Sequence, residues 1–402
     1  MKGSLPPIGP GFCLLLALVL FGRQPALADC RSFSDLIRNG AYGVADSEGR
    51  TLSSCNVNRP YVPASVIKIA TALAALRLLG PDHRFTTEFF IDQEQNLYIR
   101  GTGDPFLVSE EVERLVSALR VRGLDRINNL FIDQGRYALT GQAPGLGVSG
   151  NPYDAPVAAL AVNFNTVNIA VDQEGRVGSA ELQTPDLPIM EEMGAGLPPG
   201  VHRLNICRGG CAAEERSARY AAELFLAKWL EQGMICAGGH GVRNVPDKAR
   251  LLYTHHNSRN LEEVAASFLR FSNNYAANQV YLACGAVKYG YPATWAKAAK
   301  AVAGTLADTI GPRAAALEEM EEGAGLSRRT RVTAAAILDI LHAFRPYAHL
   351  LTENNRPGIK SGTMTGIYNL AGYTRTGNAF VILLNQQENS RDRVLLRLEK
   401  KW

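Results

Sequence analysis

The chain has 402 residues, of which 46% are hydrophobic and 20% charged, a balance typical of globular proteins rather than disordered or fibrous ones. This length is too great for one small core and indicates two or three domains. A formal net charge of +4 gives no reason to expect nucleic acid or an anionic membrane surface as a partner.

Residues 1–28 have the pattern of a secretory signal peptide. Lys2 precedes an unbroken apolar run from Phe12 to Phe21, and Ala26-Leu27-Ala28 matches a small-x-small cleavage site. The apolar run is too short to span a membrane. We therefore expect an exported, periplasmic protein that is cleaved near Ala28, with an uncleaved anchor as the alternative. A lipoprotein signal is disfavoured because the residue before Cys30 is not small.

The cysteines also suggest export. Removing the signal peptide takes away Cys13 and leaves six of the seven cysteines, an even number that favours disulfides in an exported chain. The alternative for Cys207-Arg-Gly-Gly-Cys211 is a metal or redox site, but no suitably spaced pair of histidines lies beside it. Many pairings are possible, and those expected are Cys30 with Cys55, Cys207 with Cys211, and Cys236 with Cys284.

The first elements expected in chain order are two short strands within residues 40–57, around the turn Asp46-Ser47-Glu48-Gly49. A polar stretch that contains proline follows these strands. A helix then begins near Ser65, continues to about Leu79 and ends at the breaker pair Gly80-Pro81.

Residues 81–249 are expected to form an inserted region of mixed or mainly β structure. A clear helix lies at about 109–122, and glycine and proline are dense from 141 to 156 and from 194 to 211. The strands expected in this region are Thr86–Ile91, Leu97–Arg100, Leu130–Ile132 and Val167–Val171.

Helices return after residue 250 and are followed by a strand pair. The helices expected from apolar spacing are Leu261–Phe271, Tyr275–Val287 and Val332–Phe344. The strands Tyr368–Arg375 and Phe380–Leu384 flank a Thr-Gly-Asn turn, and a short helix near 390–400 follows. The fold class expected is therefore α/β (α+β), in which residues 29–80 and 250–402 form one domain that the insert 81–249 splits.

The helix that carries Ser65 and Lys68 is apolar on every side apart from these two residues and Thr71. A helix of this kind is normally buried, and residues three apart lie on one face. Burial of the Lys68 amine disfavours its charged form and makes it a usable base. Ser65 lies at the helix start, where unpaired N–H groups stabilise a developing oxyanion. The alternative is that Ser65 caps the helix while Lys68 reaches the surface.

Two further patterns follow in the sequence. Ser272-Asn273-Asn274 comes after a predicted helix, and its alternative role is to cap the next helix. Lys360-Ser361-Gly362-Thr363 leads a predicted strand, where a lysine, a hydroxyl and an accessible backbone suit a ligand carboxylate. The alternative for this segment is an edge strand whose lysine discourages pairing with other chains.

Ser-x-x-Lys, Ser-x-Asn and Lys-Ser/Thr-Gly in this order are the motif set of penicillin-binding proteins and class A β-lactamases. The chain resembles the low-molecular-mass class C penicillin-binding proteins, which are D-alanyl-D-alanine carboxypeptidase/endopeptidases. The segments Arg100–Pro105, Glu322–Ser327 and Tyr368–Tyr373 are also similar to family segments. The resemblance covers nearly all of the chain after residue 28. It implies a transpeptidase domain, similar to that of serine β-lactamases, which a large, mainly β inserted domain splits.

The resemblance also implies roles for the candidate catalytic residues. Ser65 attacks the carbonyl between two D-alanines, and Lys68 takes its proton. Ser272 relays a proton to the leaving amine with Lys360 nearby, and Asn274 holds the substrate amide. Water then releases the acyl-enzyme.

The same resemblance implies a substrate-binding strand. Lys360 and Ser361 face the terminal carboxylate, Gly362 allows close approach, and the N–H groups of Ser65 and Thr363 form the oxyanion hole. No metal or organic cofactor is implied. The partners implied are peptidoglycan stem peptides and, as covalent inhibitors, β-lactam antibiotics.

The chain departs from the family's pattern in two ways. Residues 144–155 lack the tryptophan and paired acids that the family often carries there for recognition of the peptide side chain, and keep only Asp154. The single replacements are Asn273 for Asp, Ser361 for Thr, Glu322 for Asp and Ala324 for Ser.

The predicted function is therefore a serine D-alanyl-D-alanine carboxypeptidase/endopeptidase. One alternative is a serine β-lactamase, which is disfavoured because no Glu-x-x-x-Asn loop occurs at the expected distance. The other is a non-catalytic peptidoglycan-binding scaffold, which the altered insert favours and the intact nucleophile and base disfavour.

Overall fold

The computed structural model describes residues 3, 27–28, 30–317, 319–353 and 356–402. The predicted signal peptide lies outside these residues, apart from Gly3 and the two-residue strand β1 (Leu27–Ala28), which pairs with β3 (Thr51–Cys55). Within the described part of the chain, no helix combines the length and the apolar character needed to cross a membrane.

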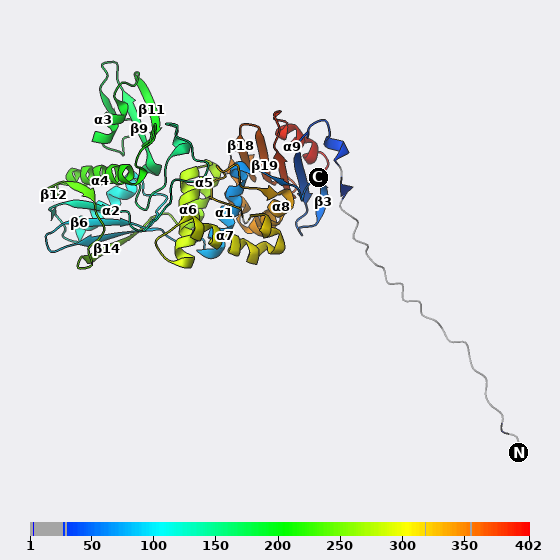
Figure 1. Ribbon diagram of the computed structural model, residues 1–402, viewed down its shortest axis with the longest axis horizontal. Helices are drawn as coiled ribbons and strands as arrows, with labels where there is room; N and C mark the ends of the chain where they lie inside the picture. Colours follow the sequence, from blue (N-terminus) through cyan, green and yellow to red (C-terminus); the bar gives the residue numbers. More distant parts are fainter. Residues whose placement is uncertain (1–2, 4–26, 29, 318, 354–355) are drawn as a thin grey trace.

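A six-stranded sheet brings together strands from the two ends of the described chain (Figure 1). The two central strands, β2 and β20, pair antiparallel and are buried along their whole length. One face of the sheet packs on α8 (Ala334–Phe344) and the other on α9 (Arg391–Glu399), which explains the continuous apolar sequence of β20. The spatial order is β1, β3, β2 (Gly40–Ala45), β20 (Ala379–Leu384), β19 (Ile367–Tyr373) and β18 (Ile359–Met364).

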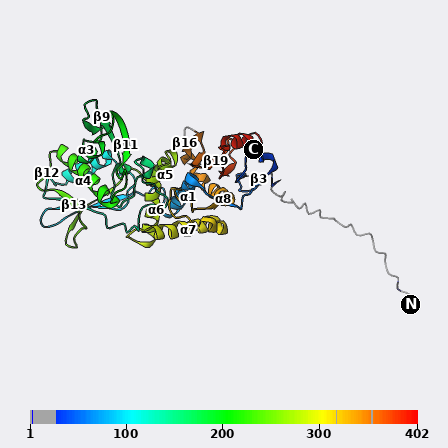
Figure 2. The same ribbon diagram turned by 45° about the horizontal axis from the view of Figure 1, so that its top comes forward.

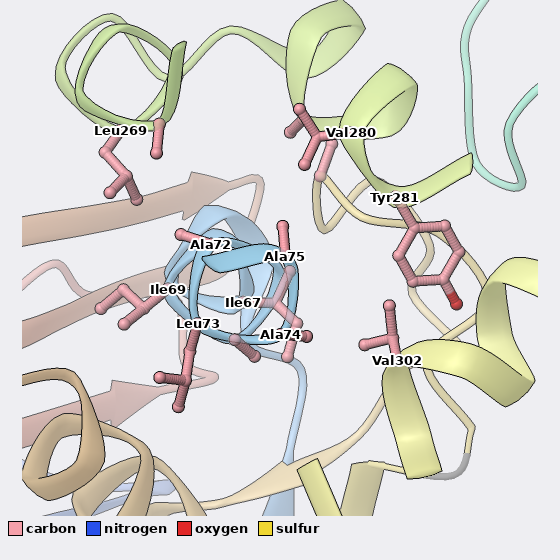
Figure 3. Packing of buried hydrophobic residues seen from close by; sticks show 14 of the residues in the cluster. Ile67, Ile69, Ala72, Leu73, Ala74, Ala75, Leu269, Val280, Tyr281 and Val302 are labelled. Carbon is pink, nitrogen blue, oxygen red and sulfur yellow. The ribbon is translucent and has the colours of Figure 1, made fainter. Parts of the chain in front are cut away.

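A block of helices lies beside this sheet, with α1 at its centre. Figure 3 shows Leu269, Val280 and Val302, each from a different helix, arranged around α1. Because neighbours enclose it, α1 can be apolar all round, and it ends before Gly80, whose φ is +87°. The alanine-rich α7 was not predicted, since alanine gives a weak periodic signal. The helices are α1 (Lys68–Leu78), α5 (Leu261–Arg270), α6 (Asn274–Tyr289) and α7 (Trp295–Ile310).

The segment between α1 and α5 forms a second group of elements with its own hydrophobic core. In both ribbon views it lies on the side of the helical block away from the six-stranded sheet (Figures 1 and 2). Its larger sheet has the order β13 (His240–Val242), β8 (Leu130–Asp133), β6 (Leu97–Gly101), β5 (Thr86–Ile91) and β14 (Arg250–His256). Its smaller sheet has the order β10 (Val177–Ser179), β9 (Thr166–Val171) and β11 (Gly200–Asn205).

Three helices complete this group, namely α2 (Ser109–Val121), α3 (Pro188–Gly194) and α4 (Ala213–Glu231). The long helix α4 was not predicted. The predicted domain boundary at residues 249 and 250 stays a prediction, and β14 extends the larger sheet to His256 through its pairing with β5.

Short elements connect these groups. The strands are β4 (Pro60–Tyr61), β7 (Arg126–Ile127), β12 (Ile235–Cys236), β15 (Val332–Thr333), β16 (Thr352–Glu353) and β17 (Arg356–Pro357). The 3-10 helices are η1 (Arg31–Phe33), η2 (Ala64–Ile67), η3 (Pro152–Asp154), η4 (Asn163–Asn165), η5 (Gly311–Leu317) and η6 (Arg345–Leu350).

Two of the three predicted disulfides are confirmed, Cys30–Cys55 and Cys207–Cys211. The predicted pair of Cys236 with Cys284 is wrong, because both are free thiols. Cys236 packs against the core of the insert, whereas Cys284 is buried in the core of the helical block. The two side chains therefore belong to separate cores.

A buried carboxylate on α2 joins the insert to the segment that leads to α5. Glu111 is 1% exposed and accepts hydrogen bonds from Ser258 N (2.8 Å) and Ser258 Oγ (2.7 Å). Its other partners are His255 Nε2 (2.7 Å) and Arg114 (2.8 Å). Burial alone would raise the pKa of Glu111, but the hydrogen bonds from His255 and Ser258 outweigh burial and lower the pKa to about 2.

Glu111→Gln is expected to lower the free energy of unfolding by about 2–3 kcal/mol at pH 7. A lowered native pKa stabilises the fold only while the carboxylate is charged, so the difference from the unmodified protein should shrink as the pH falls from about 4.5 towards 2. Urea unfolding at pH 7, 4 and 3 measures this dependence. Glu113→Gln, whose side chain is 57% exposed on the same helix, is the control and should change stability by less than about 0.5 kcal/mol. Equal losses in the two variants would contradict the assignment.

Candidate active site

Ser65 lies in the short helix η2, which leads directly into α1. The residue before it, Ala64, has a φ of +46°, a left-handed conformation that costs a non-glycine residue about 1–3 kcal/mol. Two asparagines, one on β19 and one directly after β20, hold the chain there. Asn369 donates to the two carbonyl oxygens just before Ala64 (both 2.9 Å), and Asn385 accepts from the N–H of Val62 (2.9 Å). The sheet therefore fixes the backbone that presents Ser65.

The side chain of Lys68 is completely buried and extends towards Ser65. Its Nζ donates to Ser65 Oγ (2.9 Å), to Asn274 Oδ1 (2.7 Å) and to the carbonyl oxygen of Ala324 (2.7 Å). The alternative in which Lys68 reaches the surface is therefore wrong. Neither η2 nor α1 has a side-chain N-cap hydrogen bond, so Ser65 does not serve as a helix cap.

The Ser272-Asn273-Asn274 segment contains both a helix cap and a partner of Lys68. Asn273 caps α6, because its side chain accepts from the N–H of Ala276 (2.9 Å). Asn274 instead contacts Lys68 through Oδ1, and its Nδ2 donates to the carbonyl oxygen of Tyr153 (3.1 Å). Ser272 has a φ of +52°, which turns the chain sharply between α5 and α6. The α5–α6 junction therefore places Asn273 at the start of α6 and Asn274 between Lys68 and the insert.

A loop at residues 322–327 supplies the third acceptor for Lys68. Glu322 is completely buried, and its carboxylate accepts from the four backbone N–H groups of residues 324–327 at distances from 2.7 to 3.3 Å. Gly325 lies against the strained residue before the nucleophile, since a Cβ there would be 2.1 Å from the carbonyl oxygen of Ala64. The sequence indicates this segment only through its resemblance to the family, because a carboxylate that binds backbone groups leaves no pattern in the sequence.

Lys360, Ser361, Gly362 and Thr363 all lie on β18, the edge strand beside η2. Lys360 is completely buried, so the alternative of a solvent-exposed edge lysine is wrong, and its Nζ donates to the carbonyl oxygen of Ser361 (3.0 Å). A Cβ at Gly362 would lie 3.1 Å from the backbone nitrogen of Ser65. Thr363 is exposed, and its Oγ1 accepts from Arg391 (2.6 Å). The strand therefore contacts the start of the nucleophile's helix.

Asp154, the only acid in residues 144–155, organises its own loop. Its Oδ1 accepts from Gly147 N (3.0 Å) and its Oδ2 from Ser149 Oγ (2.5 Å). The loop meets the Ser65 region through the contact of Tyr153 with Asn274.

This arrangement can support nucleophilic catalysis by a serine. A hydroxyl within hydrogen-bond distance of a buried amine can lose its proton to that amine as it attacks a carbonyl. Gly362 on β18 approaches the backbone nitrogen of Ser65, and Asn274 at the α5–α6 junction contacts Lys68. Among the described residues, no group of three or more His, Cys, Asp and Glu side chains is placed to hold a metal ion.

Comparisons with known proteins agree with this chemistry. A model of the D-Ala-D-Ala carboxypeptidase 3 (S13) family matches residues 39–194 and 206–352. The D-alanyl-D-alanine carboxypeptidase of Actinomadura sp. (strain R39) is 27% identical over 397 residues, which cover 81% of this chain and 71% of the relative. The D-alanyl-D-alanine carboxypeptidase DacB of Haemophilus influenzae is 24% identical over 404 residues, which cover 84% and 83%.

Among solved structures, the chain is similar to penicillin binding protein 4 (dacB) from H. influenzae, with a TM-score of 0.70 and 19% identity. The match covers 90% of this chain and 94% of that one. This likeness confirms the predicted fold class, a transpeptidase-type domain with an insert. The protein therefore belongs to the D-Ala-D-Ala carboxypeptidase 3 (S13) family. The resemblance to low-molecular-mass class C penicillin-binding proteins is confirmed, and the protein is a serine-type peptidase.

Gly325→Ala is expected to destabilise the fold and to impair D-alanine release from an acyl-D-alanyl-D-alanine peptide, because its methyl group would collide with the carbonyl oxygen of Ala64. Gly377→Ala is the matched control, since Gly377 has a similar φ (+83°, against +84°) but no atom lies within 4 Å of the place that its methyl group would take. Thermal unfolding should show Gly325→Ala to be less stable than the control by at least about 2 kcal/mol. Equal stability and activity in the two variants would show that this contact does not position Ser65.

Proposed function

We propose that this serine D-alanyl-D-alanine carboxypeptidase/endopeptidase acts on peptidoglycan stem peptides through an acyl-enzyme formed on Ser65, with Lys68 as the base. The observation that carries the proposal is the 2.9 Å hydrogen bond between Lys68 Nζ and Ser65 Oγ, because the amine that makes it is completely buried. The carboxypeptidase names of the Actinomadura and Haemophilus relatives support the substrate class.

The three acceptors around Lys68 explain how it acts as a base. In the neutral amine, two N–H bonds can point at Asn274 Oδ1 and the carbonyl oxygen of Ala324. The lone pair of the amine then faces Ser65 Oγ, which donates its proton as it attacks the carbonyl carbon. Burial favours this neutral form before attack, and the same two oxygens stabilise the ammonium that forms afterwards.

The remaining residues bind the substrate and complete the proton transfer. Lys360 and Ser361 bind the terminal carboxylate, and the N–H groups of Ser65 and Thr363 stabilise the tetrahedral oxyanion. Ser272 passes a proton to the amine of the departing D-alanine, so the C–N bond breaks and the acyl group stays on Ser65. Water then attacks the ester, and the proton returns to restore the free serine.

Covalent inhibition by β-lactams follows from the same chemistry. The H. influenzae protein has also been solved in a complex with a β-lactam, and this structure matches the chain with a TM-score of 0.65. A β-lactam acylates a serine as a peptide does, but the leaving amine stays attached. Rapid turnover of a chromogenic cephalosporin would instead favour a β-lactamase, and wall binding without D-alanine release would favour a scaffold.

Ser65→Ala should abolish covalent labelling by penicillin, and Lys68→Met should slow it by about 10²–10⁴-fold because the base is lost. Intact-protein mass spectrometry with mapping of the modified peptide measures both effects. Ser117→Ala on α2 is the control and should react like the unmodified protein. Equal labelling of Ser65→Ala and the unmodified protein would remove Ser65 from its role.

We also propose that residues 1–28 are a cleaved export signal and that the enzyme works in the periplasm, where its substrate is found. The disulfide Cys30–Cys55, which begins just after the proposed cleavage site, supports an oxidising compartment. The mass of the protein recovered from a periplasmic fraction should correspond to a chain that begins near Asp29. Recovery of the full-length chain from the membrane fraction alone would favour an uncleaved anchor.

A further inference from the structure

A cavity of about 850 Å³ opens beside the α5–α6 junction. The Ser272-Asn273-Asn274 segment forms part of one wall, and residues of η3, η4 and β11 form the wall that the insert contributes. Asn274 therefore contacts both the cavity and the amine of Lys68. The mechanism proposed above uses only Ser272 and Asn274 at the edge of this cavity and gives no role to its other residues.

Three arginines from different parts of the chain line the cavity. Arg203 comes from β11, Arg259 from the loop before α5, and Arg270 from the last turn of α5. No Asp or Glu is found among the described residues that line it. The salt bridges between described residues do not involve any of the three guanidinium groups. The cavity therefore holds concentrated positive charge without an internal counter-ion.

The apolar part of the cavity is built on fixed backbone. Phe106 and Phe164 meet edge to face, with ring centroids 5.0 Å apart. Phe164 is the middle residue of three consecutive left-handed residues, with φ of 48°, 59° and 52° for Asn163, Phe164 and Asn165. Buried hydrogen bonds hold this turn, including Asn165 Nδ2 to Ser217 Oγ (2.8 Å). Preformed apolar walls with a few converging charges are typical of ligand sites.

The direction of the bound peptide connects the cavity to the reaction. In the proposed mechanism the terminal carboxylate lies at Lys360 and Ser361 on β18, and the family resemblance implies that Asn274 holds the amide on the acyl side. Asn274 also lines the cavity, so the peptide chain beyond this amide would begin at the edge of the cavity. A guanidinium group binds a carboxylate through two parallel hydrogen bonds, so the arginines match an anionic peptide.

We propose that this cavity binds free carboxylate groups on the acyl side of the substrate, so that the enzyme prefers stem peptides whose carboxylates have not been converted to amides. This specificity rests on the proposed function, because it uses the peptide direction that the function assigns. It adds Arg203, Arg259 and Arg270 as specificity-determining residues.

The test compares two peptides that differ only in one charge. They are N-acetyl-γ-D-glutamyl-L-lysyl-D-alanyl-D-alanine with a free glutamyl α-carboxylate, and the same peptide with an α-carboxamide. The unmodified protein should prefer the free acid by about tenfold in kcat/KM, and added salt should reduce this ratio. The triple variant R203Q/R259Q/R270Q should bring the ratio to about one. Because the two kcat/KM values are compared within one protein, a general loss of activity does not change their ratio.

The control variant R77Q/R120Q/R126Q removes the same net charge from exposed arginines outside the cavity and should keep the preference. A ratio near one in the unmodified protein, or a preference that survives in the cavity variant, would overturn the proposal.

A binding measurement separates this proposal from the catalytic one. A fluorescent N-acyl-γ-D-glutamyl-L-lysine that lacks both D-alanines needs no turnover, and anisotropy reports its affinity. Tighter binding of its free acid than of its carboxamide, lost only in the cavity variant, supports the cavity even if neither tetrapeptide is cleaved. Equal binding of the two forms by the unmodified protein would refute the cavity whether or not Ser65 is acylated.

Discussion

The burial of the Lys68 amine is the constraint on which the rest of the structure depends. An amine in a protein core is costly unless its hydrogens have acceptors. Its acceptors come from three separate segments, namely the nucleophile's own turn, the α5–α6 junction and the 322–327 loop. Each segment is held in turn by other buried groups, such as Glu322 beneath the loop and Asn369 beneath the turn before Ser65. The reactive pair is therefore a product of long-range packing.

The insert takes part in this packing. It reaches the reactive pair through the carbonyl oxygen of Tyr153, which accepts from Asn274. It is also joined to the segment before α5 through two buried carboxylates, since Asn257 donates to Asp104 (2.8 Å) and Ser258 donates to Glu111. Because the last two hydrogen bonds are made to buried carboxylates, the insert has a defined position beside the α5–α6 junction. The insert thus has its own hydrophobic core and also contributes one wall of the cavity beside the α5–α6 junction.

The sequence was sufficient where the signal is local. The apolar helix around Lys68 and the order of the three motifs depend only on residue types and short spacings. The helix α4 was not predicted because several of its polar residues are buried. Glu223, for example, is buried and accepts a hydrogen bond from the N–H of Ile189, which is distant in the sequence. Its periodicity is therefore weak. Asn369 was identified only as part of a segment similar to the family, because the two carbonyl oxygens to which it donates lie about 306 residues away in the sequence. The even number of cysteines suggested a third disulfide, but an even number does not show which thiols lie close enough to bond.

The sheet topology has a consequence for when the enzyme becomes reactive. Strand β2 lies near the beginning of the described chain and β20 near its end, yet they are neighbours at the centre of the sheet. During synthesis Ser65 and Lys68 are made early, whereas Ala324 and β18 are made late. A nascent or truncated chain that stops before Ala324 carries the serine and the lysine but lacks one acceptor of the amine, and a chain that stops before β20 still lacks a central strand of the sheet. The sheet on which the nucleophile's turn rests is therefore completed only by one of the last segments of the chain to be made.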